Sequence, residues 1–169
     1  MKFLTVSRCL HSTLLGRLKV DADMTITIVI GDIDTIHIEF ITELLQDCIG
    51  RKHELNVPHF QFAGEIVEYA SANEVDLFVL FLNNILFRSS NAPVESRMRQ
   101  VMRLVWDLKT KHERPIIGIC GIDTYEDFAS IAGVDYFFTV PFNPREFSTA
   151  VQECLPWSDL LGHGPIGNA

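Results

Sequence analysis

The chain has 169 residues, of which 47% are hydrophobic and 21% are charged, which is enough for one globular domain with a sizeable core. Its formal net charge of −8 argues against direct binding to nucleic acid, because the phosphate backbone would be repelled. The cysteines form no CxxC pair and have no histidine at metal-ligand spacing, so we predict reduced core thiols and a cytoplasmic protein. They are Cys9, Cys48, Cys120 and Cys154.

The first 23 residues are predicted to be an extension that precedes the compact domain. Its basic residues interrupt any apolar run that could serve as a signal peptide or a membrane span. An extra helix, a contact arm and disorder are all compatible with its sequence. The domain is predicted to cover residues 24–155, and a tail with proline and glycine to cover 156–169.

The first predicted strand is the β-branched run "TITIVI", residues 25–30, followed by Gly31, Asp32 and Asp34. Apolar residues at helical spacing then predict a helix, with Asp34 or Thr35 as its N-cap. We therefore interpret Asp34 as a helix cap and Asp32 as a solvated residue at the strand end. His37, close to these acids, is interpreted as a solvated residue of the helix surface, with a role as a pH sensor as the alternative.

Two further strands and a helix are predicted in the middle of the chain. The stretch "HFQFA", residues 59–63, indicates a short strand, and Ile66, Val67 and Ala70 mark one face of the helix that follows. The run "DLFVLFL", residues 76–82, is apolar after its first residue and is typical of the centre of a parallel sheet.

The longest predicted helix carries an apolar stripe from Met98 to Leu108. Trp106 lies off this stripe, which makes it a candidate for contact with a partner or for covering by the N-terminal extension. A strand is predicted at 115–120, "PIIGIC", and a capping-box pattern at Asp123 and Glu126 predicts another helix.

The last strand and helix are predicted from the sequence after Gly133. The stretch "VDYFFTV" at 134–140 is the strand, and Asn143 caps a helix whose first turn contains Pro144. Strands and helices thus alternate along the chain, which predicts an α/β fold: a doubly wound, five-stranded parallel sheet with helices on both faces. In such sheets the functional loops follow the carboxyl ends of the strands.

Three stretches of the chain resemble the response-regulator receiver (CheY-like) family. "AGVDYFFTVPFNPREF" is similar to the receiver ending in which a lysine, a proline and a phenylalanine follow the fifth strand, and "VDLFVLFL" and "RPIIGICG" resemble the third and fourth strands. The resemblance covers roughly residues 24–155 and implies the strand order 2-1-3-4-5. It also implies a cis peptide bond before Pro141.

A receiver is phosphorylated on an aspartate at the end of its third strand, and acids after the first strand hold Mg²⁺. Transferred by position, the resemblance places Phe81 at the phosphoacceptor, Cys120 at a hydroxyl and Val140 at a lysine. Of the acids, Asp32 and, less clearly, Asp34 remain, while Gly31 stands where a second acid is expected, so we expect no bound metal.

We therefore expect Phe81, Cys120 and Val140 to converge in one apolar pocket in place of the ion cluster. No nucleophile or cofactor-binding motif is present, so we expect neither catalysis nor a cofactor. These expectations predict a phosphorylation-independent pseudo-receiver that acts as a protein-interaction module in signal transduction. The alternatives are an atypical phosphorylation-responsive receiver that uses displaced acids, and a small-ligand sensor.

The predicted partner surface surrounds the last strand and the last helix. It contains Tyr136, Phe137, Phe138 and Phe142. Receivers commonly pair through the face formed by the fourth helix, the fifth strand and the fifth helix, so the resemblance suggests a homodimer as one form of this interaction. An ordinary packing role for Phe137 is the alternative.

Overall fold

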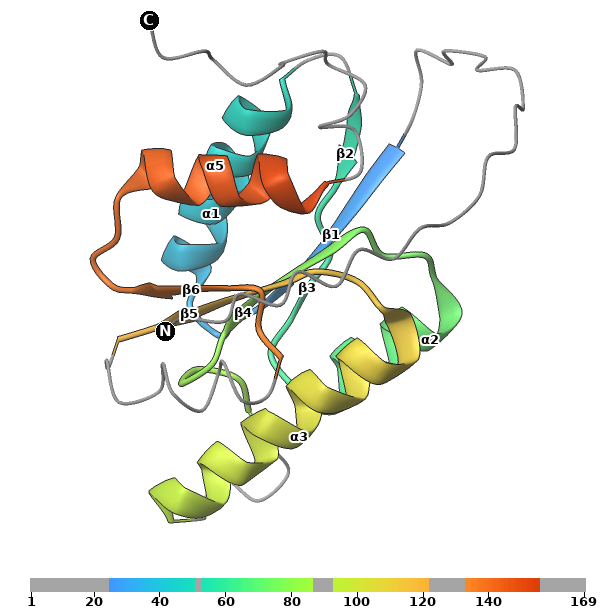
Figure 1. The fold of residues 1–169 in the computed structure, drawn as a ribbon, viewed down its shortest axis with the longest axis vertical. Helices are drawn as coiled ribbons and strands as arrows, with labels where there is room; N and C mark the ends of the chain where they lie inside the picture. Colours follow the sequence, from blue (N-terminus) through green and yellow to red (C-terminus); the bar gives the residue numbers. More distant parts are fainter. Residues whose placement is uncertain (1–24, 51–52, 87–92, 122–132, 156–169) are drawn as a thin grey trace, which may run out of the picture.

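A computed structural model of the chain describes residues 25–50, 53–86, 93–121 and 133–155. Within them, a parallel sheet has the strand order β2-β1-β4-β5-β6, and β3 also pairs with β1 (Figure 1). The strands are β1 (Thr25–Gly31), β2 (Glu54–Asn56), β3 (His59–Phe60), β4 (Leu77–Phe81), β5 (Ile116–Cys120) and β6 (Tyr136–Thr139). The helices are α1 (Thr35–Ile49), α2 (Ala63–Ala72), α3 (Val94–His112) and α5 (Pro144–Cys154).

The observed topology confirms the predicted fold class and strand order. One difference lies beside β1, where two short strands, β2 and β3, replace the single strand predicted at 59–63. Pro58 lies between them and has no backbone N–H to give to a ladder, although its carbonyl accepts a hydrogen bond from the Ile30 amide at 3.0 Å. The predicted helix with Asp123 and Glu126 lies outside the described residues, as do the N-terminal extension and the C-terminal tail.

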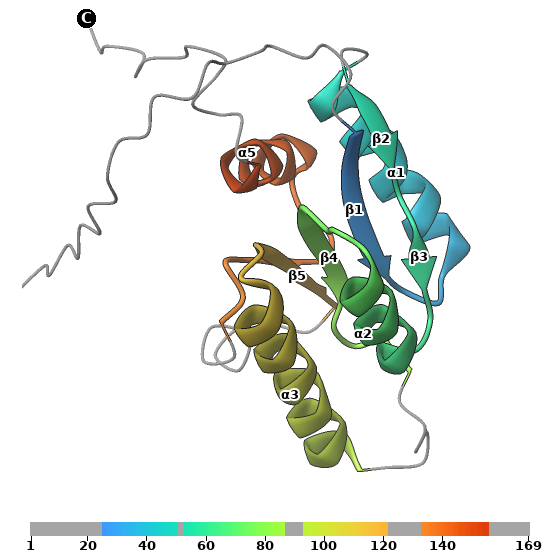
Figure 2. The same cartoon turned by 90° about the vertical axis from the view of Figure 1, so that its right-hand side faces the viewer.

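The sheet has a hydrophobic core on each face, which explains why its central strands are continuously apolar. Successive side chains of a strand point to opposite faces, so β4 contributes Phe78 and Leu80 to one core and Val79 and Phe81 to the other. Helices α2 and α3 cover the first core, and α1 and α5 cover the second (Figure 2).

Polar contacts at the amino ends of the strands fix the register between layers. Lys109 of α3 forms an ion pair with Asp135 at 2.6 Å, and the same carboxylate accepts a hydrogen bond from the Ile116 amide at 2.7 Å. These bonds tie the end of α3 to the starts of β5 and β6. The opposite end of the sheet, where the strands terminate, is left for the candidate site.

Candidate functional site

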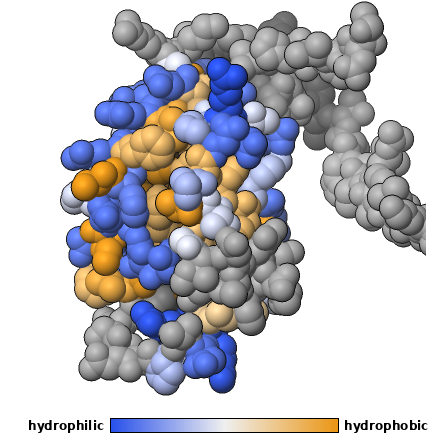
Figure 3. Space-filling view, turned by 90° about the vertical axis from the view of Figure 1, so that its left-hand side faces the viewer, coloured by the Kyte–Doolittle hydropathy of each residue, from blue (hydrophilic) through white to orange (hydrophobic). Residues whose placement is uncertain are grey.

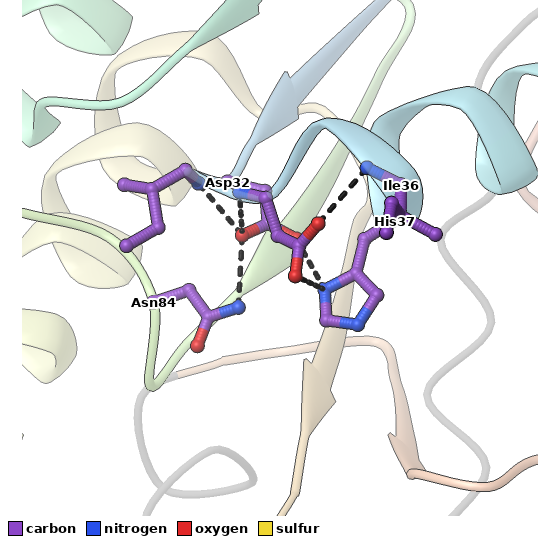
Figure 4. A network of polar contacts seen from close by, with 6 residues as sticks. Asp32, Ile36, His37 and Asn84 are labelled. Carbon is purple, nitrogen blue, oxygen red and sulfur yellow. Dashed lines mark hydrogen bonds and ion pairs between the residues drawn. The ribbon is translucent and has the colours of Figure 1, made fainter.

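Asp32 lies directly after β1 at the carboxyl end of the sheet, and its side chain is fully buried, at 0% exposure. Its Oδ1 atom accepts hydrogen bonds from the Ile33 amide at 2.7 Å and the Asp34 amide at 3.1 Å. The Asn84 side chain donates to the same oxygen at 2.8 Å (Figure 4). The prediction that Asp32 is solvated is therefore wrong, because the turn after β1 and the turn after β4 enclose its carboxylate.

The second oxygen of Asp32 is bound by His37, from the first turn of α1. Nδ1 of His37 lies 3.0 Å from Oδ2 of Asp32 and 4.0 Å from Oδ2 of Asp34. A carboxylate only accepts hydrogen bonds, so the Nδ1 atom carries the proton in this contact. The side chain of His37 is 38% exposed. His37 thus lies at the helix surface as predicted, but it is not merely solvated, since one edge of its ring binds the Asp32 carboxylate.

Asp34 has the predicted role of N-cap of α1. Its Oδ1 atom accepts a hydrogen bond from the Ile36 amide at 2.9 Å, and its own backbone is extended, with φ −92° and ψ 113°. Such a bond satisfies one of the amides that the first helical turn leaves without a partner. One oxygen of Asp34 is therefore already occupied by the fold.

Gly31 precedes Asp32 at a position where the packing leaves no room for a side chain. A Cβ atom on Gly31 would lie 2.9 Å from Cδ1 of Ile66 and 3.0 Å from Cδ2 of Leu80. An acid at this position would have to displace both core side chains. The close approach of α2 to β1 thus gives a physical reason for the single buried carboxylate at the end of β1.

Phe81 ends β4 next to this cluster and is 3% exposed. Its ring is stacked on the imidazole of His37, with the centroids 4.9 Å apart and the planes 5° from parallel. The phenyl ring thereby supports the imidazole that binds Asp32. The residue that the resemblance placed at the phosphoacceptor position is an apolar wall of the cluster.

The predicted convergence of Phe81, Cys120 and Val140 is not observed. Cys120 is buried in the core under α2 and α3, whereas Phe81 belongs to the core under α1 and α5. Val140 is 40% exposed, and its amide donates a hydrogen bond to the Cys120 carbonyl at 2.9 Å. The sheet thus separates the side chains of Cys120 and Phe81. The site around Asp32 is closed by hydrogen bonds and by the stacking of Phe81 on His37, not by a cluster of the three predicted apolar side chains.

The bond between Val140 and Pro141 is cis, as the resemblance implied. The nearby residues predicted to bind a partner are half-buried and lie on both sides of the sheet. Phe137 packs on the core under α2 and α3, whereas Tyr136, Phe138 and Phe142 pack on the other core. In the described part of the chain β6 pairs only with β5, so β6 is an edge strand.

Tyr136 has an additional polar contact on this edge. Its hydroxyl donates a hydrogen bond to Oε2 of Glu153 on α5. This hydrogen bond to a carboxylate, together with partial burial, raises the pKa of Tyr136 to about 12. The contact ties the start of β6 to the end of α5.

No group of three or more His, Cys, Asp or Glu side chains that could hold a metal ion occurs within 25–50, 53–86, 93–121 and 133–155. The described helices also include none that is long and apolar enough to cross a membrane. Of the cysteines in the described part of the chain, Cys48 and Cys154 are half-buried and Cys120 is buried.

The sequence matches no protein-family model and no curated protein. Solved structures do match. A CheY-like receiver domain from Methanospirillum hungatei is 19% identical, with a TM-score of 0.59, over 82% of this chain and 99% of that chain. A response regulator from Thermotoga maritima is 13% identical, with a TM-score of 0.60, over 78% and 98%.

A signal receiver domain from Clostridium thermocellum has a TM-score of 0.57 at 16% identity, over 77% of this chain and 97% of that chain. The chain has the receiver fold. Each of these matches covers almost the whole of the other protein's chain. The receiver fold does not by itself assign a chemistry to the Asp32 cluster, which has to be argued from this chain's own residues.

Proposed function

We propose that the chain is a pseudo-receiver: a signalling module that binds a protein partner and is not phosphorylated. The observation that carries this proposal is the burial of the Asp32 carboxylate. It is fully buried and accepts hydrogen bonds from two backbone amides and from the side chains of Asn84 and His37. Each of its oxygens is already bound. A receiver needs such a carboxylate free to hold a metal ion.

The binding of Mg²⁺ would require this cluster to be dismantled. Mg²⁺ prefers octahedral coordination by oxygen atoms, several of them usually from water. Here the ion would have to displace His37 from Oδ2 of Asp32, and Asp32 has no exposed surface through which water could enter. The donors around Asp32 thus stabilise its carboxylate by hydrogen bonds within the fold.

The residue at the end of β4 supports the same proposal. The resemblance assigns the phosphoacceptor role to the position of Phe81, and a phenyl ring cannot attack phosphorus. Neither neighbouring acid replaces it readily, because Asp32 is enclosed and Asp34 caps α1. The alternative of an atypical receiver that uses displaced acids requires one of them to leave these contacts.

For the interaction surface we propose the exposed edge of β6 and the adjacent α5, with a second copy of the chain as one candidate partner. An edge strand offers unpaired backbone groups to another chain, and half-buried aromatic side chains such as Tyr136 and Phe142 are frequent in protein interfaces. The net charge of −8 argues for a protein partner and against nucleic acid.

The proposal is tested by incubating the full chain with acetyl phosphate and Mg²⁺ and measuring its intact mass under conditions that preserve acyl phosphates. A receiver of known activity serves as the positive control. We expect no added phosphoryl group on this chain. An adduct on Asp32 or Asp34 would favour the phosphorylation-responsive alternative, and stabilisation by a metabolite in a thermal-shift screen would favour the ligand sensor.

A further inference from the structure

The outward face of α1 carries large apolar side chains that the described part of the structure leaves uncovered. Ile36 is 73% exposed and Phe40 is 43% exposed, and residues four apart share one face of a helix. The ring of Phe40 also contacts Phe142, with centroids 6.2 Å apart. We call Ile36, Phe40 and Phe142 the α1 patch. Figure 3 shows hydrophobic residues between hydrophilic ones on this side of the molecule.

Acidic residues lie beside the α1 patch along α1, whereas the exposed Arg145 follows Phe142 at the start of α5. Glu39 and Glu43 are exposed on the same helix, three residues after Ile36 and Phe40 respectively, and Asp34 precedes the helix. Residues 25–50 contain no lysine or arginine. A complementary partner should therefore combine apolar side chains with positive charges.

A second copy of the chain does not meet this requirement at the α1 patch. In a two-fold symmetric dimer the same surface is used by both subunits, so acids would be brought near the equivalent acids of the other copy. Like charges placed together in an interface are unfavourable.

The first 20 residues of the same chain do meet it. This segment has no aspartate or glutamate, and its charged residues are Lys2, Arg8, Arg17 and Lys19. Between them lie apolar residues, which are Phe3, Leu4, Val6, Leu10, Leu14, Leu15 and Leu18.

The segment is also long enough to reach the α1 patch. It joins the domain at Thr25, the first residue of β1, and the seven residues of β1 span about 23 Å to the end where α1 begins. A chain of 24 residues spans up to about 80 Å when extended.

We infer that residues 1–20 dock in cis on the α1 patch, with their apolar side chains on Ile36 and Phe40 and their basic side chains near Glu39 and Glu43. The docked segment covers a surface that a partner would otherwise meet. This inference goes beyond the proposed function and does not depend on it: the α1 patch shares Phe142 with the proposed interaction surface, but the docking is argued and tested at Ile36 and Phe40 and does not concern phosphorylation.

Cys9 allows the docking to be measured in the full chain. In the variant Phe40→Cys, mild oxidation should give an intramolecular disulfide between Cys9 and the introduced thiol, identified by peptide mapping. Trp106→Cys is the comparison variant, because Trp106 is 60% exposed on α3, on the other side of the sheet, and is the alternative place at which the N-terminal extension could dock. Docking raises the effective concentration of the two thiols, so the first disulfide should form at least roughly tenfold faster.

The native thiols interfere little with this experiment. Burial raises the pKa of Cys48 and raises that of Cys154 to about 12, so both are protonated and react slowly at neutral pH. Ile36→Cys provides a second site should Phe40→Cys disturb the fold, which circular dichroism would reveal.

The role of charge is tested by adding Glu39→Lys and Glu43→Lys to Phe40→Cys, which should slow the disulfide. Glu68→Lys with Glu74→Lys, both exposed outside α1, is the matched control and should leave the rate unchanged.

Equal rates of disulfide formation in Phe40→Cys and Trp106→Cys would overturn the inference. A disulfide-linked dimer through two introduced thiols would overturn it in favour of a second copy.

Discussion

The imidazole of His37 is stacked on the phenyl ring of Phe81, with the centroids 4.9 Å apart, while its Nδ1 atom binds Asp32 at 3.0 Å. One side chain from α1 thus connects the end of β4 to the end of β1. The stacking holds the imidazole in the orientation that lets it donate to the buried carboxylate. This relationship underlies the proposal that the acidic end of the sheet is closed.

Replacement of Phe81 by alanine should destabilise the protein by about 3–5 kcal/mol, because it leaves a cavity in the core under α1 and α5. The loss of the stacked ring should also loosen His37. Urea denaturation followed by circular dichroism measures the free energy of unfolding. Phe40→Ala is the matched control, and its 43% exposure predicts a clearly smaller loss. Equal losses in the two variants would contradict the packing described here.

Gly31→Ala should destabilise the protein by about 1–3 kcal/mol, because the new Cβ atom would lie 2.9 Å from Cδ1 of Ile66. Gly64→Ala in α2 is the control, since a Cβ atom there would meet nothing within 4 Å. Alanine is the better helix former, so the control should be neutral or stabilise by up to about 1 kcal/mol. Thermal denaturation of both variants gives the comparison. A neutral Gly31→Ala variant would refute the steric explanation for the missing second acid.

Asp32→Asn should destabilise the protein by about 2–4 kcal/mol, although the two side chains have nearly the same shape. The amide can still accept hydrogen bonds at one atom, but its NH₂ group cannot accept from His37 or from the amides of the turn. Asp34→Ala, which removes only a helix cap, should cost about 1 kcal/mol. The two losses are compared by urea denaturation, and the account would be contradicted by a larger loss for Asp34→Ala.

The positions of the central strands along the chain and the cap of α1 could be predicted because both depend on local sequence, whereas the strand order in the sheet was implied by the resemblance to receivers. Apolar runs such as residues 76–82 define buried strands, and Asp34 stands directly before a helical stripe. The Asp32 cluster could not be predicted in the same way, because Asn84 is 52 residues away in sequence. The pairing of strands could have indicated the contact, since Asn84 follows β4, the strand that pairs with β1, and the ends of neighbouring parallel strands lie close together.

The errors at the other strand ends have a similar origin. The resemblance, transferred by position, places Phe81 and Cys120 in one pocket, but a shift of one residue along a strand turns a side chain to the opposite face. Phe81 pairs with Ile119, so Cys120 is one residue beyond it. The position of each residue along its strand therefore decides which core it enters, and strand-end position alone does not.

Tyr136 should titrate well above an ordinary tyrosine, because its hydroxyl donates to Glu153 and raises its pKa to about 12. Ultraviolet absorbance during an alkaline titration measures this, with Tyr136→Phe used to assign the signal. Glu153→Gln should move the midpoint down towards 10. Since the folded-state pKa is raised, the contact's contribution to stability is complete below about pH 10 and is lost as the pH rises towards 12. An unchanged midpoint in Glu153→Gln would contradict the assignment.

The occupancy of Asp32 is tested most directly by nuclear magnetic resonance with Mn²⁺, a paramagnetic ion that broadens signals close to its binding site. The imidazole signals of His37 and the side-chain amide of Asn84 report on the carboxylate, and His112 at the end of α3, near the opposite end of the sheet, is the internal control. We expect the signals of His37 and Asn84 to broaden no more than those of His112. Selective broadening of His37 and Asn84 at low Mn²⁺ would show that the carboxylate accepts a divalent ion, and would contradict a closed pocket.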